Sequence, residues 1–179
     1  YTFMITSDTI CAQATAQGGA ISVIRVSGQN AIEITSRIFS KDITKAKGYT
    51  LHYGHITDPQ QEGANIIDDV LVSVFRSPHS YTGEDSTEIS CHGSRFIVQQ
   101  ILEALIFSGA RLATPGEFTK RAFLNGRLDL TEAEAVADLI HAETAEGVEN
   151  AAAQLSGRLG SELSSIYNSL LDLISHFTA

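Results

Sequence analysis

Short stretches in which hydrophobic and polar residues alternate make up much of the first two thirds of the chain. This alternation, together with β-branched residues, predicts strands at residues 8–15, 21–27, 49–57, 66–75, 87–91 and 111–113. Residues 31–39 and 96–106 carry apolar side chains every three or four positions, which predicts two helices, and a helical turn should run from Pro115 to Leu124. Strands and helices that alternate irregularly with short links indicate an α+β fold with a mixed β-sheet.

The pattern becomes helical throughout beyond residue 118. Thr131 and Glu134 have the spacing of a capping box, in which each side chain accepts from the other residue's backbone amide, so one helix should start there. A second helix is expected from about Ala142 to the end of the chain. Its apolar seam is typical of a helical bundle and comprises Val148, Ala152, Leu155, Leu159, Leu163, Ile166, Leu170 and Leu173. We expect further helix, from the same protein or another chain, to cover this seam. We predict two domains, residues 1–118 and 119–179.

The distribution of charge also indicates two structural units, with a break at about Leu128. The net charge is −9, and residues 129–179 contain nine acidic residues against one basic residue, Arg158. The chain therefore lacks the strongly basic surface that binds nucleic acid directly. Cys11 and Cys91 have neither disulfide-framework nor metal-site spacing, which favours a reducing cytoplasm. No apolar run is long enough to span a bilayer, so no membrane association is expected.

The segment from Ser80 to Gly93 is the most informative part of the chain. It begins as a polar, carboxylate-rich loop, becomes a strand and leads into a helix. Glu88 lies in that strand and should face away from its neighbour Ile89. A half-buried carboxylate needs a partner, because an unpaired buried charge is costly. That partner is either a structural cation or a ligand, such as a flat heterocycle with the amidine edge of a pterin or a guanine.

Two arginines are further candidates. Arg25 interrupts an apolar strand and pairs either with a structural carboxylate or with an anion or carbonyl oxygen of a ligand. Arg127 follows the turn Asn125-Gly126, where exposed surface is the default interpretation and contact with a neighbouring pocket is the alternative. Cys91 should lie in the core and His92 should face away from it, which argues against a nucleophile–base pair. The sequence contains neither a P-loop nor a dinucleotide-binding fingerprint.

Six motifs together resemble the amino-terminal region of the tRNA modification GTPases of the MnmE (TrmE) family. They follow the family's order over nearly the whole chain, and the last two are long and specific. The motifs are Asp8-Thr9-Ile10-Cys11-Ala12, Ile24-Arg25-Val26-Ser27-Gly28, Ser80-Tyr81-Thr82-Gly83-Glu84-Asp85, Glu88-Ile89-Ser90-Cys91-His92-Gly93, the stretch from Pro115 to Gly126 and the stretch from Leu128 to Ile140.

The resemblance implies a tetrahydrofolate-binding domain, similar to that of aminomethyltransferases, that forms homodimers and precedes a helical domain. It implies that Arg25, Glu88 and Arg127 contact 5-formyl- or 5,10-methylene-tetrahydrofolate. It places GTP, K⁺, Mg²⁺ and GTP hydrolysis in a GTPase domain absent from this chain, so no catalytic residue or metal site is expected here. The family acts in the cytoplasm with a FAD-containing partner of the MnmG type and adds a (carboxymethyl)aminomethyl group to C5 of the wobble uridine of tRNA.

The sequence departs from the family pattern in three places. The loop at residues 16–20 is one residue shorter than usual, Arg127 stands where lysine is common, and Ser94 stands where a second glycine is common. These departures leave open an alternative, a dimerising scaffold of the same GTPase that does not bind folate. A stand-alone folate-dependent transferase is a third possibility, against which the uncovered helical seam argues.

Overall fold

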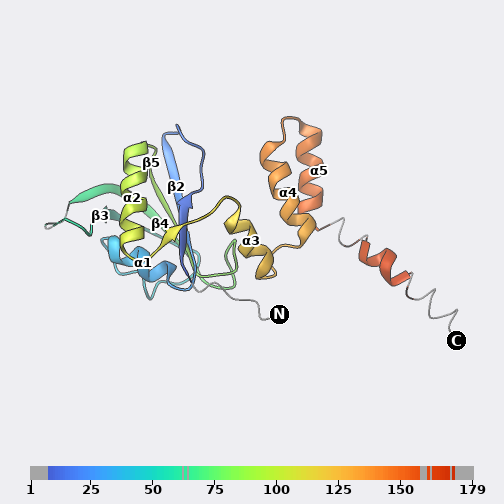
Figure 1. Cartoon of the computed structure of the whole chain (residues 1–179), viewed down its shortest axis with the longest axis horizontal. Coiled ribbons are helices and arrows are strands. Elements are labelled where there is room, and N and C mark those ends of the chain that lie inside the picture. The colour runs from blue at the N-terminus through green and yellow to red at the C-terminus, as the bar shows by residue number, and fades with distance from the viewer. Residues whose placement is uncertain are drawn as a thin grey trace. The chain divides into compact units, whose positions relative to one another are not determined.

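A computed structural model of the chain describes residues 8–61, 63, 65–157, 161, 163–169 and 171. The chain divides into two compact units, Tyr1–Phe118 and Thr119–Ala179, whose helices and strands are labelled in Figure 1. Among the residues described, no helix combines the length and the apolar character needed to cross a membrane.

The first unit is built on a six-stranded sheet with the strand order β3-β4-β5-β2-β1-β6. All neighbouring strands are antiparallel except β1 and β6, which are parallel. The mixed sheet predicted from the sequence is therefore confirmed. The strands are β1 (Ile10–Gln13), β2 (Ile21–Ser27), β3 (Thr50–Thr57), β4 (Ile66–Phe75), β5 (Ser86–His92) and β6 (Arg111–Leu112).

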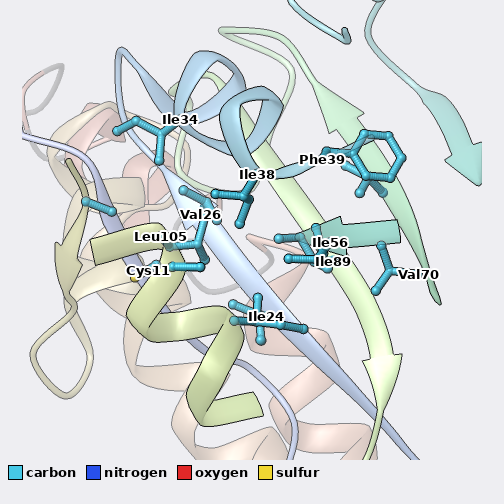
Figure 2. Close-up of a cluster of buried hydrophobic side chains, with 14 of the residues drawn as sticks. Cys11, Ile24, Val26, Ile34, Ile38, Phe39, Ile56, Val70, Ile89 and Leu105 are labelled. Carbon is cyan, nitrogen blue, oxygen red and sulfur yellow. The ribbon is translucent and has the colours of Figure 1, made fainter. Parts of the chain in front are cut away.

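Two helices, α1 (Ala31–Ile38) and α2 (Arg95–Phe107), cover one face of this sheet. Alternate strand residues and the apolar stripes of the two helices form a single buried cluster, because side chains two apart in a strand share a face. Figure 2 shows part of the cluster, including Ile24, Val26 and Ile89 from the sheet and Ile34, Ile38 and Leu105 from the helices.

The intervening strand residues form the opposite face, which we call the open face. Apolar side chains on this face remain accessible over β3 and β4, where Leu51 and Tyr53 are each 62% exposed and Leu71 is 40% exposed. Leu71 is the cross-strand partner of Tyr53. Arg25 and Glu88 occupy the same face, because their strand neighbours Ile24, Val26 and Ile89 are all in the core.

The second unit contains most of α3 (Glu117–Leu124), followed by α4 (Leu130–His141) and α5 (Ala145–Leu155), which pack side by side (Figure 1). The predicted capping box at Thr131 and Glu134 is wrong. Asp129 caps α4 instead: its side chain accepts from the Glu132 amide at 2.7 Å, and Glu132 accepts from the Asp129 amide at 2.7 Å. Aspartate is at least as good an N-cap residue as threonine, and Asp129 comes two residues before Thr131 in the chain. The helix therefore starts after Asp129.

The single helix predicted from Ala142 to the end is also wrong. Thr144 caps α5 by accepting from the Gly147 amide at 3.1 Å, and the helix ends at Leu155. Gly157 then adopts a φ of +76°, a left-handed conformation that glycine enters without a Cβ penalty. Residues 163–169 are helical again, and Leu163 and Ile166 there are more than half exposed. Three predicted seam residues, Leu159, Leu170 and Leu173, lie outside the described residues.

Candidate functional site

The structure brings Arg25 and Glu88 together. They are direct cross-strand partners on β2 and β5. The guanidinium donates from Nε to the Oε1 oxygen of Glu88 at 2.9 Å, and its Nη2 forms an ion pair with the same oxygen at 2.8 Å. The sequence left a structural partner or a ligand open for each residue, and in the structure each is a structural partner of the other.

The Arg25–Glu88 pair keeps hydrogen-bonding capacity for a third molecule. A guanidinium carries five N–H donors and a carboxylate accepts at both oxygens. Within the described ranges, neither the Nη1 group of Arg25 nor the Oε2 oxygen of Glu88 has a hydrogen-bond partner. The side chains are 22% and 28% exposed, and a pair this accessible stabilises the fold by only about 1 kcal/mol or less. The pair therefore presents a donor beside an acceptor at the surface of the sheet.

Two aromatic rings lie against the same guanidinium. The Cζ atom of Arg25 is 4.7 Å from the ring centroid of Tyr81 and 5.5 Å from that of Phe118. Both distances are in the range of cation–π attraction. The sequence analysis singled out neither aromatic residue as part of the site, although both lie within the motifs that carry the resemblance.

The loop that carries Tyr81 is fixed to the end of β2. Thr82 and Ser27 are fully buried, with their hydroxyl oxygens 2.6 Å apart. Ser27 donates to the Oε2 oxygen of Glu84 at 2.8 Å, and a hydroxyl has one hydrogen, so Thr82 must be the donor to Ser27. A backbone bond adds to this contact, because the Gly28 amide donates to the Asp85 carbonyl at 3.0 Å. The strand that presents Arg25 thus also anchors the loop beside it.

Cys91 and His92 do not form a catalytic pair. Cys91 is 3% exposed in the core, and burial, with a contribution from the charge of Asp68, raises the pKa of its thiol to about 11. His92 has an exposed side chain, and its Nδ1 lies 2.7 Å from the Oδ1 oxygen of Asp68. The His92 amide donates to the other oxygen of Asp68 at 2.8 Å. The prediction that these neighbours face apart is confirmed.

Arg127 lies in the second unit, so the structure unites two of the three predicted site residues, Arg25 and Glu88. It is an exposed residue that follows Gly126, whose φ of +69° ends the turn after α3. The Arg127 amide donates to the Ala122 carbonyl at 2.8 Å, which fixes the backbone at this point. Across the described part of the chain, no group of three or more histidine, cysteine, aspartate or glutamate side chains could hold a metal ion.

Fold and site together define an α+β domain that presents a hydrogen-bonded arginine–carboxylate pair on its open face and continues into a helical hairpin. The chain belongs to the family described as "GTP-binding protein TrmE N-terminus", which matches residues 9–127. Residues 130–179 match the family described as "MnmE helical domain".

Bacterial proteins named tRNA modification GTPase MnmE are similar to this chain. The protein of Bacteroides thetaiotaomicron is 55% identical over 94% of the chain and 36% of its own length. The protein of Phocaeicola vulgatus is 49% identical over 98% of the chain and 41% of its own length. The protein of Thermoanaerobacter pseudethanolicus is 50% identical over 96% of the chain and 38% of its own length. The chain thus spans about two fifths of the relatives it matches.

Proposed function

We propose that this chain is the tetrahydrofolate-binding and homodimerising part of a tRNA modification GTPase. The family membership and the names of the relatives support the protein class. The observation that carries the folate-binding role is the Arg25–Glu88 pair, which offers a donor next to an acceptor on a partly exposed face.

The pair fits the pyrimidinone edge of a pterin. That edge carries N–H donors at N3 and at the 2-amino group, and next to them the O4 carbonyl acceptor. The Oε2 oxygen of Glu88 would accept from the pterin N–H groups, and the Nη1 group of Arg25 would donate to O4. Charge-assisted contacts of this kind are strong and directional. Arg25 would therefore act at the same end of the ligand as Glu88, and Arg127 stays a third folate contact that we propose from the family resemblance alone.

The open face of the sheet supports the homodimer. Leu51, Tyr53 and Leu71 are large apolar side chains that remain 40–62% exposed on neighbouring strands. A cluster of exposed apolar side chains on a β-sheet is typical of a protein–protein interface. Burial of these side chains against a second copy would place the interface on the same face as the Arg25–Glu88 pair.

The activities of the whole protein follow from the family. GTP hydrolysis, with its K⁺ and Mg²⁺, would reside in the part of the relatives that this chain does not span, since the chain has no P-loop. Together with a FAD protein of the MnmG type, the full protein would act in the cytoplasm on the wobble uridine of tRNA. Bound 5-formyl- or 5,10-methylene-tetrahydrofolate would supply the one-carbon unit for the (carboxymethyl)aminomethyl group at C5.

Calorimetric titration of the chain with 5-formyltetrahydrofolate tests the folate-binding role. We expect saturable binding near one site per chain, and loss of at least about tenfold in affinity for Glu88→Ala, because one charge-assisted contact contributes about 1.5–3 kcal/mol. Glu103→Ala, which removes an exposed glutamate of α2, is the matched control and should bind like the wild type. Unchanged affinity in a folded Glu88→Ala variant would contradict the role of Glu88.

The alternative function is a dimerising scaffold without folate binding, which the departures from the family pattern at residues 16–20 and Ser94 favour. Light scattering separates the two functions when it is combined with the titration. A dimer that gives no heat with the folate would favour the scaffold, and a dimer that binds the folate would exclude it.

A further inference from the structure

The ring of Tyr81 is the group most closely stacked on the guanidinium at the candidate site. Its centroid is 4.7 Å from the Cζ atom of Arg25, against 5.5 Å for Phe118. We propose that Tyr81 is a positioning residue, whose ring fixes the guanidinium of Arg25 so that the Arg25–Glu88 pair offers a rigid donor–acceptor edge to its ligand. The ligand part of this inference rests on the proposed folate binding.

Arg25 needs such a restraint because its contact with Glu88 does not fully orient it. The Nε–H of Arg25 donates to Oε1, and the ion-pair contact, from Nη2, is to the same oxygen. Two parallel hydrogen bonds to the two carboxylate oxygens would keep the guanidinium and carboxylate planes aligned. Contact with a single oxygen atom lets the guanidinium pivot about that atom. A ring stacked on the guanidinium opposes this pivoting, since the attraction depends on the cation staying over the ring.

Hydrogen bonds of the residues on both sides of Tyr81 hold its backbone in place. Ser80 is 5% exposed and its hydroxyl donates to the Glu84 carbonyl at 2.5 Å. Thr82 on the other side is fully buried and bonded to Ser27. Ser27 lies two residues beyond Arg25 in β2, so a single strand sets the position of the ring and of the cation it holds. The loop is therefore built to keep Tyr81 at a fixed distance from Arg25.

Two substitutions test whether the aromatic ring of Tyr81, rather than its apolar bulk or its hydroxyl, positions Arg25. Tyr81→Leu removes the aromatic face and keeps an apolar side chain, and Tyr81→Phe keeps the ring. We expect Tyr81→Leu to weaken 5-formyltetrahydrofolate binding about tenfold, within the range of a partly desolvated cation–π contact, and Tyr81→Phe to stay within about twofold of wild type. Phe107→Leu, at a 61% exposed ring on α2, is the matched control and should not change the affinity.

A second measurement needs no ligand. The Nε–H proton of Arg25 is hydrogen-bonded to Glu88, so it should give a slowly exchanging ¹⁵N-correlated NMR signal, which Arg25→Lys assigns by its disappearance. We expect this signal to exchange at least severalfold faster in Tyr81→Leu and to be unchanged in Tyr81→Phe and Phe107→Leu.

The two measurements distinguish failure of this inference from failure of the proposed function. If the wild-type chain binds no folate but the Arg25 signal behaves as expected, the folate proposal fails and the positioning role stands. If Tyr81→Leu leaves the Arg25 exchange rate unchanged in a folded chain, the positioning role is overturned whatever the folate does. If Tyr81→Phe changes the folate affinity and the Arg25 exchange rate as much as Tyr81→Leu does, the aromatic ring is not what positions Arg25, and the inference is likewise overturned.

Discussion

The two units of the chain differ in how much apolar surface each can bury. In the first unit, large side chains such as Ile24, Ile89 and Leu105 are completely inaccessible to solvent. In the second unit, the buried hydrophobic residues among those described are all alanines, Ala122, Ala135 and Ala151. Its large apolar residues remain accessible instead, with Leu130 at 62%, Ile140 at 74% and Val148 at 44% exposure.

This difference indicates that the two units depend on their surroundings to different degrees. Folded stability comes mainly from buried apolar surface, and a short helical hairpin without it is marginal in water. The first unit carries its own core, whereas the α4–α5 hairpin is supported chiefly by its caps and by small residues at the helix contact. The charge follows the same division, because eight of the nine excess negative charges lie at residues 129–179. The expectation of a covering helix for this unit stays a prediction.

Truncation of a core isoleucine should give the largest effect. Ile89→Ala removes a fully buried side chain at the centre of the sheet, and we expect a loss of about 2–5 kcal/mol in the free energy of unfolding. Ile21→Ala is the matched control, because Ile21 is 65% exposed on the neighbouring strand and its loss should change stability by less than about 1 kcal/mol. Urea unfolding followed by circular dichroism measures both variants. Similar losses in the two would mean that the core of the first unit is not its main support.

The second effect arises from a buried thiol in the same core. Burial raises the pKa of Cys91 from 9.0 to about 11, so the folded state binds this proton more tightly than the unfolded state. The resulting stabilisation is complete below pH 9 and is lost as the pH rises towards 11. A shift of this size corresponds to at most about 2–3 kcal/mol. Cys91→Ala should therefore lose less stability than the wild type between pH 8 and pH 11 in parallel urea titrations. An equal loss in both proteins would show that Cys91 ionisation does not contribute.

The sequence predicted the first unit better than the second for a physical reason. Strands β2 and β4 have the bounds expected from alternation, because one of their faces is buried and the pattern is therefore strict. In the second unit little is buried, so helix ends depend on local signals that compete. Asp129 and Thr131 are both good caps, and the turn at Gly157, whose φ of +76° favours a residue without Cβ, interrupts the apolar repeat that predicted one continuous helix.

The candidate site was predictable only as separate residues. Glu88 and Arg25 were singled out because each is a charge within an apolar strand. The two residues are 63 positions apart in the sequence. Their pairing depends on the register between β2 and β5, which no local pattern determines. The stacking of Tyr81 on Arg25 depends on the path of a loop held by buried hydroxyl groups, and that path has no signature in the order of polar and apolar residues.

The smallest effect should come from the cap of α4, where the second unit has little else to support it. The backbone N–H of Glu132, and next the Thr131 hydroxyl, hold the pKa of Asp129 below its usual value of 3.8. Because the folded state lowers this pKa, the stabilisation is present above about pH 4 and is lost as the pH falls further. Asp129→Ala should reduce the helical circular dichroism signal at pH 7 slightly, and the difference from wild type should shrink towards pH 3. Asp138→Ala, in the exposed middle of α4, is the control and should leave helix content the same or slightly higher, since alanine is the better helix former. A loss for Asp138→Ala equal to that for Asp129→Ala would mean that acidic charge in general, rather than the cap, supports the hairpin.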